Sequence, residues 1–386
     1  MTVGPSNGKV LYFITSSLSS RLLRGQLDYV ASQGFEVVVG VGVEAGSDVG
    51  HLALDFDESA RVVDIGFARE IALIKDLKSL FRAIQLVRKE RPSIVNFSTP
   101  KAALIGAFAA WICRVPQRVY VVRGLRYETS TGVGRRLLIA LEKLICRSAT
   151  HIIMNGASLI DVAVADGLVS RDRCRVLAGG SGNGIDTSVL VAVDESKRAA
   201  RTKLGIPPDA LVVGFVGRLT KDKGIVDLAQ ILPDLVERHP AVVLLAVGGF
   251  EDGDPVPSST RQQLESSDHV IMAGWVENPA QAYAAMDLLA FPSYREGLPN
   301  VVLEAQLAGL PVVGYRATGT VDAVDEGKTG LLVPVSDTTA LTDAASTVLN
   351  DSAMLEKMGS EARAFVEERF SREVVWADLV SVYNER

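Results

Sequence analysis

Short apolar runs alternate with longer amphipathic stretches through the first half of the chain. Val- and Ile-rich runs of this length are typical of parallel strands whose two faces are covered, and the stretches between them have the period of helices. The pattern predicts strands at 9–16, 36–43, 94–96, 118–122 and 151–154, and helices at 18–32, 74–89, 102–114 and 135–147. This order is that of a doubly wound α/β domain.

The second half repeats the pattern after a glycine-rich segment at 178–186, which suits a turn between domains. Strands are predicted at 211–216, 242–247, 269–272, 288–290, 312–314 and 331–333, and helices at 337–350 and 352–370. A chain of 386 residues exceeds one hydrophobic core. We therefore expect two Rossmann-like domains, residues 1–187 and 188–370, with a last helix at 371–386 that returns to the first domain.

Composition narrows the function class. The net charge of −6 argues against a nucleic-acid partner, which normally requires a basic surface. Cys113, Cys146 and Cys174 form no metal-binding or disulfide spacing. The apolar patch 102–113 is too short to span a bilayer, and the run 10–14 is too short for a signal peptide. These features favour a cytoplasmic protein.

The loop after the strand at 211–216 carries the first candidate chemistry. It contains Gly217, Arg218 and Lys223 and leads into an amphipathic helix at Ile225. Glycine lets backbone approach a ligand, a helix start offers unpaired amides, and ligands of open α/β sheets bind at the carboxyl ends of strands. The two cations could neutralise a diphosphate. A solvated turn with ordinary surface cations remains the alternative.

The segment 292–305 is the second candidate, because it places two carboxylates around a turn that begins a helix. Seven residues separate Glu296 from Glu304, and the turn between them consists of Gly297, Leu298, Pro299, Asn300 and Val301. Pro and Asn suit a helix start, so Glu304 should lie about one turn inside the helix. Each carboxylate could accept hydrogen bonds from sugar hydroxyls while the amides face a phosphate.

These residues resemble the retaining family 4 glycosyltransferases of the GT-B fold, above all the bacterial enzymes of capsule, exopolysaccharide and lipopolysaccharide synthesis. The resemblance covers nearly the whole chain and is most specific at 217–224 and 282–334, including Asp325–Val333. It implies a hexosyltransferase that moves a hexose or N-acetylhexosamine, with a UDP-sugar as the first candidate donor. The implied acceptor is a sugar or a polyprenyl-linked sugar.

The resemblance also implies roles for individual residues. Arg218 and Lys223 would bind the donor diphosphate, and Glu304 the ribose. Glu296, with the amides of 297–301, would bind the sugar and the distal phosphate, and Glu296 is the first catalytic candidate. Trp275 and Val276, in the loop 274–277, would lie by the nucleobase.

Two segments depart from the family pattern. Relatives commonly carry His-Gly after a strand of the first domain, where this chain has Arg123 and Gly124. An arginine cannot act as a base, but it can stabilise developing phosphate charge, so Arg123 is the second catalytic candidate, with an ion pair as the alternative. Many relatives also place glycines after the first strand, where this chain is serine-rich.

Three residues of the first domain are candidates for the acceptor side or the cleft edge: Ser17, Thr99 and Lys101. The serines around Ser17 suit a helix N-cap, with a contact to the acceptor or to a phosphate as the alternative. Thr99 and Lys101 begin a helix in a segment that looks like a cleft edge of the capsule-type relatives, although Lys101 could simply be solvated.

No cofactor is expected. The pairs Asp55/Asp57 and Asp252/Asp254 have the Asp-x-Asp spacing of metal-dependent transferases but no accompanying ligand cluster. The four histidines are scattered, which disfavours a metal triad. We therefore expect metal-independent transfer. A nucleotide-sugar epimerase and a noncatalytic nucleotide-sugar-binding protein remain the alternative functions.

The helix at 135–147 has two interpretations. It is basic at both ends and apolar in the middle, as a helix lying on an anionic membrane would be. A core helix with charged ends has the same pattern. The first interpretation would bring the enzyme to the inner face of the plasma membrane.

Overall fold

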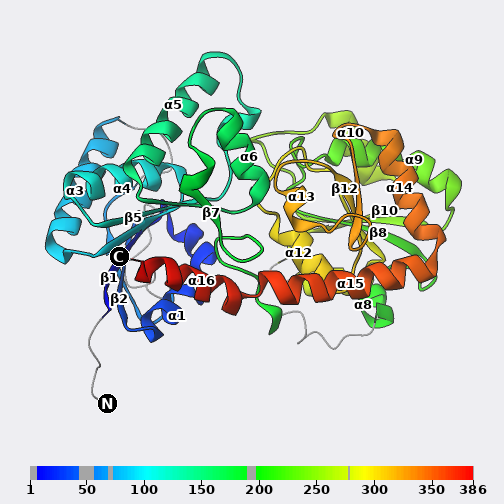
Figure 1. Cartoon of the computed structure of the whole chain (residues 1–386). Helices are drawn as coiled ribbons and strands as arrows, with labels where there is room; N and C mark the ends of the chain where they lie inside the picture. Colours follow the sequence, from blue (N-terminus) through cyan, green and yellow to red (C-terminus); the bar gives the residue numbers. More distant parts are fainter. Residues whose placement is uncertain (1–6, 43–55, 68–72, 189–196, 277–278, 386) are drawn as a thin grey trace. The chain divides into compact units, whose positions relative to one another are not determined.

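The computed structural model describes residues 7–42, 56–67, 73–188, 197–276 and 279–385 (Figure 1). Its contacts divide the chain into two compact units. Unit 1 comprises Met1–Gly184 and Arg372–Arg386, and unit 2 comprises Ile185–Ser371. Each unit contains one parallel sheet between helices, as the sequence predicts for Rossmann-like domains.

Unit 1 is built on a seven-stranded sheet with the order β3-β2-β1-β4-β5-β6-β7. Every strand pair in it is parallel. The strands are β1 (Gly8–Phe13), β2 (Phe35–Val41), β3 (Ala60–Asp64), β4 (Ile94–Phe97), β5 (Gln117–Val122), β6 (His151–Met154) and β7 (Cys174–Val176). The hydrophobic pattern does not reveal β3 and β7, because these edge strands are only partly buried and β7 has only three residues.

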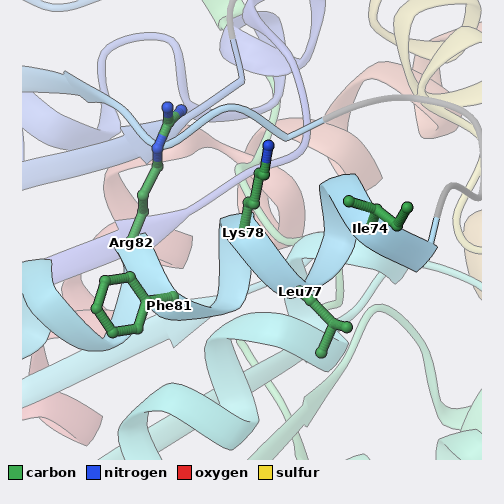
Figure 2. A pocket seen from close by; sticks show the side chains of 5 residues that line it. All are labelled: Ile74, Leu77, Lys78, Phe81 and Arg82. Carbon is green, nitrogen blue, oxygen red and sulfur yellow. The ribbon is translucent and has the colours of Figure 1, made fainter.

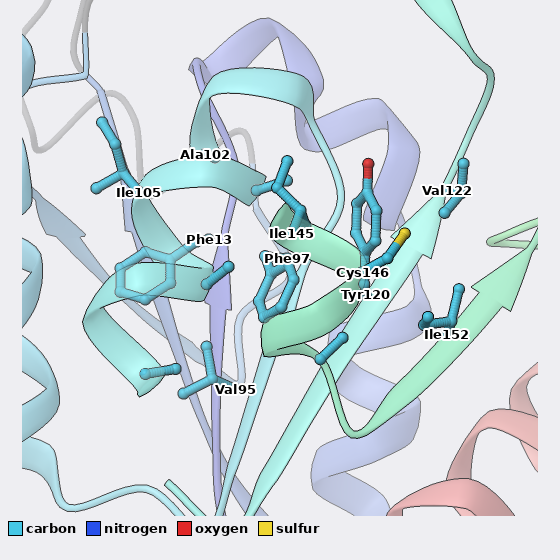
Figure 3. Close-up of a cluster of buried hydrophobic side chains, with 14 of the residues drawn as sticks. Phe13, Val95, Phe97, Ala102, Ile105, Tyr120, Val122, Ile145, Cys146 and Ile152 are labelled. Carbon is cyan, nitrogen blue, oxygen red and sulfur yellow. The ribbon is translucent and has the colours of Figure 1, made fainter. Parts of the chain in front are cut away.

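Alternate residues of the strands in unit 1 enter two separate cores. Leu11 and Phe13 of β1 face one core, and Val10 and Tyr12 face the other, as the two-residue period of a strand requires. The first core lies under α3 (Leu73–Glu90), α4 (Pro100–Ile112) and α5 (Gly132–Ser148). Figure 3 shows Phe13 and the stacked rings of Phe97 and Tyr120 in this core.

The second core of unit 1 is covered by α1 (Gln26–Ser32) and α16 (Arg372–Asn384). Leu379 and Tyr383 of α16 are buried in it, and Asn96 of β4 donates a hydrogen bond to the Tyr383 hydroxyl at 2.7 Å. The last helix therefore packs on the first domain, as the sequence predicts. The remaining helices of unit 1 are η1 (Ser17–Leu23), η3 (Arg126–Thr129), α6 (Ala157–Ala165) and η4 (Arg171–Arg173).

The prediction of one continuous helix at 18–32 is wrong. The segment forms the 3-10 helix η1 and then, after a turn, the separate helix α1. The Asp57 carboxylate accepts hydrogen bonds from the amides of Gly25, Leu27 and Asp28 at 2.9, 2.9 and 3.2 Å. A distant carboxylate thus satisfies the free amides at the start of α1, and it stabilises a helix end that local sequence does not reveal.

Unit 2 has a six-stranded parallel sheet with the order β10-β9-β8-β11-β12-β13. Its strands are β8 (Leu211–Val216), β9 (Val242–Val247), β10 (Val270–Gly274), β11 (Leu288–Phe291), β12 (Val312–Tyr315) and β13 (Gly330–Val333). Its helices are α8 (Lys197–Lys203), α9 (Ile225–Arg238), α10 (Ser258–Ser266), α11 (Ala280–Ala285), α12 (Asn300–Leu307), α13 (Thr320–Ala323), α14 (Thr338–Asn350) and α15 (Ser352–Phe370). Two cores again lie on the two faces of the sheet.

None of the helices in the described ranges combines the length and the apolar character that crossing a bilayer requires.

Candidate functional site

The order of strands in unit 2 identifies where a ligand should bind. From β8 the chain adds β9 and β10 on one side, and it then adds β11, β12 and β13 on the other. The direction of winding therefore reverses between β8 and β11. In open α/β sheets, ligands bind outside the carboxyl ends of the strands at such a point. The loops that leave these two strands, 217–224 and 292–299, are the two candidate segments.

Direct contacts hold the two loops together. The amide of Tyr294 donates to the carbonyl of Asp222 at 3.0 Å. Gly224 has φ +73°, and a side chain there would place its Cβ 2.1 Å from the carbonyl oxygen of Pro292. Only glycine permits this approach. The two segments therefore form one structural unit, although about seventy residues separate them in the chain.

An ion pair connects the two candidate segments. Lys223 Nζ lies 2.5 Å from Glu296 Oε1, and the two side chains are only 17% and 14% exposed. The Ser293 hydroxyl, which is fully buried, donates to the same oxygen at 2.7 Å. Glu296 Oε2 accepts no hydrogen bond from the described residues. The carboxylate is thus held in place through one oxygen and keeps the other for a ligand.

Arg218 lies at the same site but is more exposed. Its guanidinium contacts the Glu251 carboxylate at 3.0 Å and the Asp222 carboxylate at 3.5 Å. Burial acts against its charge, but Glu251 and Asp222 outweigh burial and raise its pKa. Arg218 is half exposed, and an ion pair at such a site contributes about 0–1 kcal/mol. An incoming diphosphate can therefore replace these carboxylates at small cost.

The start of α12 supplies hydrogen-bond donors and a second carboxylate. The amides of Gly297, Leu298, Asn300 and Val301 have no acceptor among the described residues, while Pro299 has no amide to offer. The motif predicts amide donors over the whole range 297–301, and Pro299 is the exception. Four free amides at a helix N-terminus form a site for an anion.

Glu304 lies one turn into α12, as predicted, and its surroundings disfavour its charge. The Tyr283 hydroxyl donates to Glu304 Oε2 at 3.0 Å. Burial raises the pKa of Glu304, and the bond from Tyr283 only partly offsets this effect. Burial of an ionisable carboxyl group costs free energy of folding, and such a group is typical of a functional site where a polar ligand completes its hydrogen bonds.

The proposed nucleobase segment follows β10. The Trp275 side chain is 68% exposed, whereas Val276 packs against the core of unit 2. Gly248 donates its amide to the carbonyl of Gly274 at 2.8 Å, which connects this loop to the one after β9. Glu277 lies outside the described residues. An exposed indole beside the sheet edge is free to stack on a planar ligand.

Arg123 lies in unit 1 after β5. Its Nη2 donates to the carbonyl of Leu22 at 3.2 Å, and its buried Nε has no partner. Within the described residues Arg123 forms no ion pair. Burial lowers the pKa of Arg123 to about 10, so the group remains protonated at pH 7. A buried cation without a carboxylate partner is suited to bind an anion.

Two other candidates of unit 1, Thr99 and Lys101, have structural partners. The Thr99 hydroxyl, at the N-cap of α4, contacts the Thr15 amide and hydroxyl at 2.9 and 2.7 Å. Lys101 forms a 2.8 Å ion pair with Asp76, so it is not simply solvated. Ser17 lies in η1, but its side chain is outside the described set. Ser16, the N-cap of η1, makes no side-chain capping bond.

One aspartate of each Asp-x-Asp pair has a partner. Asp57 caps α1, and Asp254 accepts from the Asp222 amide at 2.7 Å. Asp252 is exposed, and Asp55 lies outside the described residues. The part of the chain that the structure describes contains no group of three or more His, Cys, Asp or Glu residues placed to hold a metal ion.

The structure places three further residues beside the candidates that the sequence does not single out: Ser293, Tyr283 and Asn155. Ser293 was visible in the motif but only its contact with Glu296 reveals its role. Tyr283 comes from α11, outside the motif. Asn155 is buried, and its Oδ1 has no partner. A Cβ on Gly182 would lie about 3 Å from both this Oδ1 and Arg123 Nη1, so Asn155 and Arg123 lie on the same side of Gly182. No linear pattern identifies such neighbours.

Comparisons with known proteins match both halves of the chain. The family model "Glycosyl transferases group 1" matches residues 196–365, and "Glycosyl transferase 4-like domain" matches residues 20–180. The capsular polysaccharide biosynthesis glycosyltransferase CapM of Staphylococcus aureus is 36% identical over 98% of this chain and 97% of its own length. An Escherichia coli UDP-Gal:alpha-D-GlcNAc-diphosphoundecaprenol alpha-1,3-galactosyltransferase is 25% identical over 77% of each chain.

Solved structures share the fold. Anabaena HepE in complex with UDP has a TM-score of 0.76 at 21% identity and covers 97% of this chain and 99% of its own. Sucrose-phosphate synthase from Thermosynechococcus elongatus has a TM-score of 0.78 at 19% identity and covers 97% and 98%.

The close contact between the loops after β8 and β9 gives a first test. Gly248 has φ +137°, and a Cβ there would lie 1.8 Å from the Gly217 carbonyl oxygen, whereas a Cβ on Gly249 meets nothing within 4 Å. Backbone displacement at this site should cost about 2–3 kcal/mol. We expect Gly248→Ala to lower the melting temperature by roughly 5–10 °C, and to weaken UDP binding because Gly217 moves. Gly249→Ala is the matched control, and equal effects of the two changes would refute the argument.

The cost of ionising Glu304 gives a second test. Because folding raises its pKa, the ionised carboxylate lowers stability, and this loss develops as the pH rises above the unfolded value of 4.5. Glu304→Gln should therefore raise the melting temperature at pH 7 but not at pH 4. It should also weaken nucleotide binding by about 10- to 100-fold, because a charge-assisted hydrogen bond is lost. A pH-independent change in melting temperature, or unchanged UDP affinity by calorimetry, would contradict this expectation.

Proposed function

Because the chain belongs to the family 4 glycosyltransferases of the GT-B fold, we propose that it transfers a hexose or N-acetylhexosamine from a UDP-sugar in surface polysaccharide synthesis. The protein is a glycosyltransferase. The identity of its donor, the identity of its acceptor and the retention of configuration at the anomeric carbon are our proposal. The observation that carries the proposal is the Lys223–Glu296 pair beside the free amides of α12. Names of the relatives support it, since one makes capsule and another uses UDP-Gal.

The donor contacts follow from the chemistry of the site. Arg218 and Lys223 offset the charge of the diphosphate, and the amides at 297, 298, 300 and 301 bind its distal phosphate. Glu296 accepts hydrogen bonds from sugar hydroxyls through its free oxygen. Glu304, a half-buried carboxylate that Tyr283 orients, accepts hydrogen bonds from the ribose hydroxyls.

Transfer proceeds with retention in our proposal. The acceptor hydroxyl oxygen bonds to the anomeric carbon on the face from which the diphosphate oxygen departs, and the hydroxyl proton passes to that departing phosphate. Arg123, which keeps its charge at pH 7, stabilises the negative charge that develops there. Arginine therefore supplies electrostatic stabilisation where relatives commonly have histidine.

No metal takes part in this scheme. Two cations and the amides of α12 already neutralise the diphosphate, and the aspartates Asp57 and Asp254 accept backbone hydrogen bonds instead. The acceptor is a sugar or a polyprenyl-linked sugar, in keeping with the diphosphoundecaprenol substrate that the E. coli relative's name gives. We place the protein in the cytoplasm, with residues 135–147 in contact with the inner face of the plasma membrane.

The test is transfer from a panel of UDP-hexoses and UDP-N-acetylhexosamines to a polyprenyl-diphosphate-linked sugar, with the product's anomeric configuration read by NMR. We expect a product that keeps the donor configuration, and turnover in EDTA within about twofold of that in magnesium. Turnover that EDTA abolishes and manganese restores would refute metal independence. An epimerised donor formed without acceptor would favour an epimerase, and donor binding without hydrolysis or transfer would favour a noncatalytic protein.

Arg123 gives a separate kinetic prediction. Arg123→Ala should lower kcat about 100-fold and change the KM for the donor only slightly, since a preorganised cation acts mainly on developing charge. Arg123→Lys should recover part of the rate because it restores the charge. The matched control is Arg126→Ala, an exposed arginine of the same loop, which should stay near the wild-type rate. A kcat for Arg123→Ala above half of the wild-type value would rule out the role.

A further inference from the structure

The outer surface of the helix layer in unit 1 gathers exposed apolar side chains. Helix α4 packs between α3 and α5. Of the twelve large apolar side chains that are exposed in the described ranges, eight lie on these three helices. Single exposed apolar residues are ordinary, but a gathering of this kind marks a contact surface. We call the outward side of α3, α4 and α5 the three-helix face.

Helix α3 combines apolar and cationic residues on its outward side. Ile74, Leu77 and Phe81 are 73%, 67% and 61% exposed. With Lys78 and Arg82 they line a shallow hollow of about 370 Å³ (Figure 2). Figure 2 shows Lys78 and Arg82 extending from the same side of the helix, away from Leu77. The hollow can accept apolar groups while the two cations meet anionic ones.

Helix α5 has the same arrangement. Val133, Leu137 and Leu144 are exposed and follow each other at helical spacings of four and seven residues, so they form one apolar stripe. Arg136 and Arg147 are also exposed and flank the stripe. The other side of the helix enters the core of unit 1. The outward side of the helix therefore has the pattern of the membrane interpretation, and the inward side has that of the core interpretation.

Helix α4 lies between α3 and α5 and continues the apolar surface. Trp111, near its end, is 59% exposed. With Phe108 and the α5 residues Leu144 and Arg147, it lines a second hollow, of about 180 Å³. An exposed indole beside an arginine is typical of surfaces that lie at the boundary of a bilayer, because both side chains have an apolar body and a polar end.

Charge distinguishes the three-helix face from the rest of the protein. Helix α3 carries five Lys or Arg residues and two acidic residues. Helix α5 carries four basic residues and one acidic residue, and α4 carries one basic residue and no acidic residue. The whole chain, by contrast, has a net charge of −6. All three acids have partners. Glu90 pairs with Lys9 and Arg61, Asp76 pairs with Lys101, and Glu142 accepts from Tyr120.

We infer that the three-helix face binds an anionic lipid bilayer, with the apolar residues of α3, α4 and α5 in the interfacial region and the cations against the headgroups. The inference rests on the proposed function, because it extends the contact proposed for residues 135–147 to two further helices. A second copy of the chain fits less well, since a two-fold interface would bring the same cations together.

The test is sedimentation with vesicles of phosphatidylcholine, alone or with phosphatidylglycerol. Wild-type protein should bind the anionic vesicles and lose binding as salt is added. Leu77→Ser with Phe81→Ser should weaken binding at least about tenfold, and Lys75→Gln with Lys78→Gln about fivefold per lysine. The matched controls lie in unit 2: Val335→Ser for apolar loss, and Lys328→Gln with Lys357→Gln for charge loss.

Nucleotide binding separates this surface from the donor site. Thermal shift with UDP in vesicle-free buffer should be the same for the wild type and all four variants. A protein that binds vesicles but not UDP would refute only the proposed function. The inference fails if anionic vesicles do not bind, if the α3 variants bind like the controls, or if those variants change the oligomeric state but not vesicle binding.

Discussion

The ion pair between Lys223 and Glu296 is the contact on which the proposed donor site depends. It connects the loop after β8 to the loop after β11, at the point where the order of the sheet reverses. Both side chains are largely buried, so each partner compensates for the other's loss of hydration. Ser293 fixes the same carboxylate oxygen. The pair thereby holds the two loops together and leaves the other carboxylate oxygen of Glu296 free just before the start of α12.

Two candidate groups, one in each unit, keep charge at the expense of stability. Glu304 stays half buried although burial raises its pKa, and Arg123 keeps a buried Nε without a partner. Groups of this kind lower the stability of the protein without ligand and gain hydrogen bonds when an anionic, hydroxyl-rich ligand binds. A nucleotide-sugar has both chemistries.

The helix layer of unit 1 has two sides of different character. The inward sides of α3, α4 and α5 cover the core that contains Phe13 and Phe97, while their outward sides carry apolar and cationic groups. A helix that covers a core and a helix that lies on a membrane can both have an apolar middle and charged ends, which is why the sequence left two interpretations of 135–147 open. The burial of each side chain shows which residues face the core and which face outward.

The sequence by itself determined the two-domain α/β class, the family, the return of the last helix and the helix start that carries Glu304, because hydrophobic period and local motif encode these features. The roles of Arg123, Thr99 and the donor residues stay predictions. Only the tertiary structure decided that Asp57 divides the helix predicted at 18–32, that Ser293 and Tyr283 hold the two glutamates, and that α3 joins α5 in one surface. These contacts join residues far apart in the chain, and no local pattern specifies which distant side chains will meet.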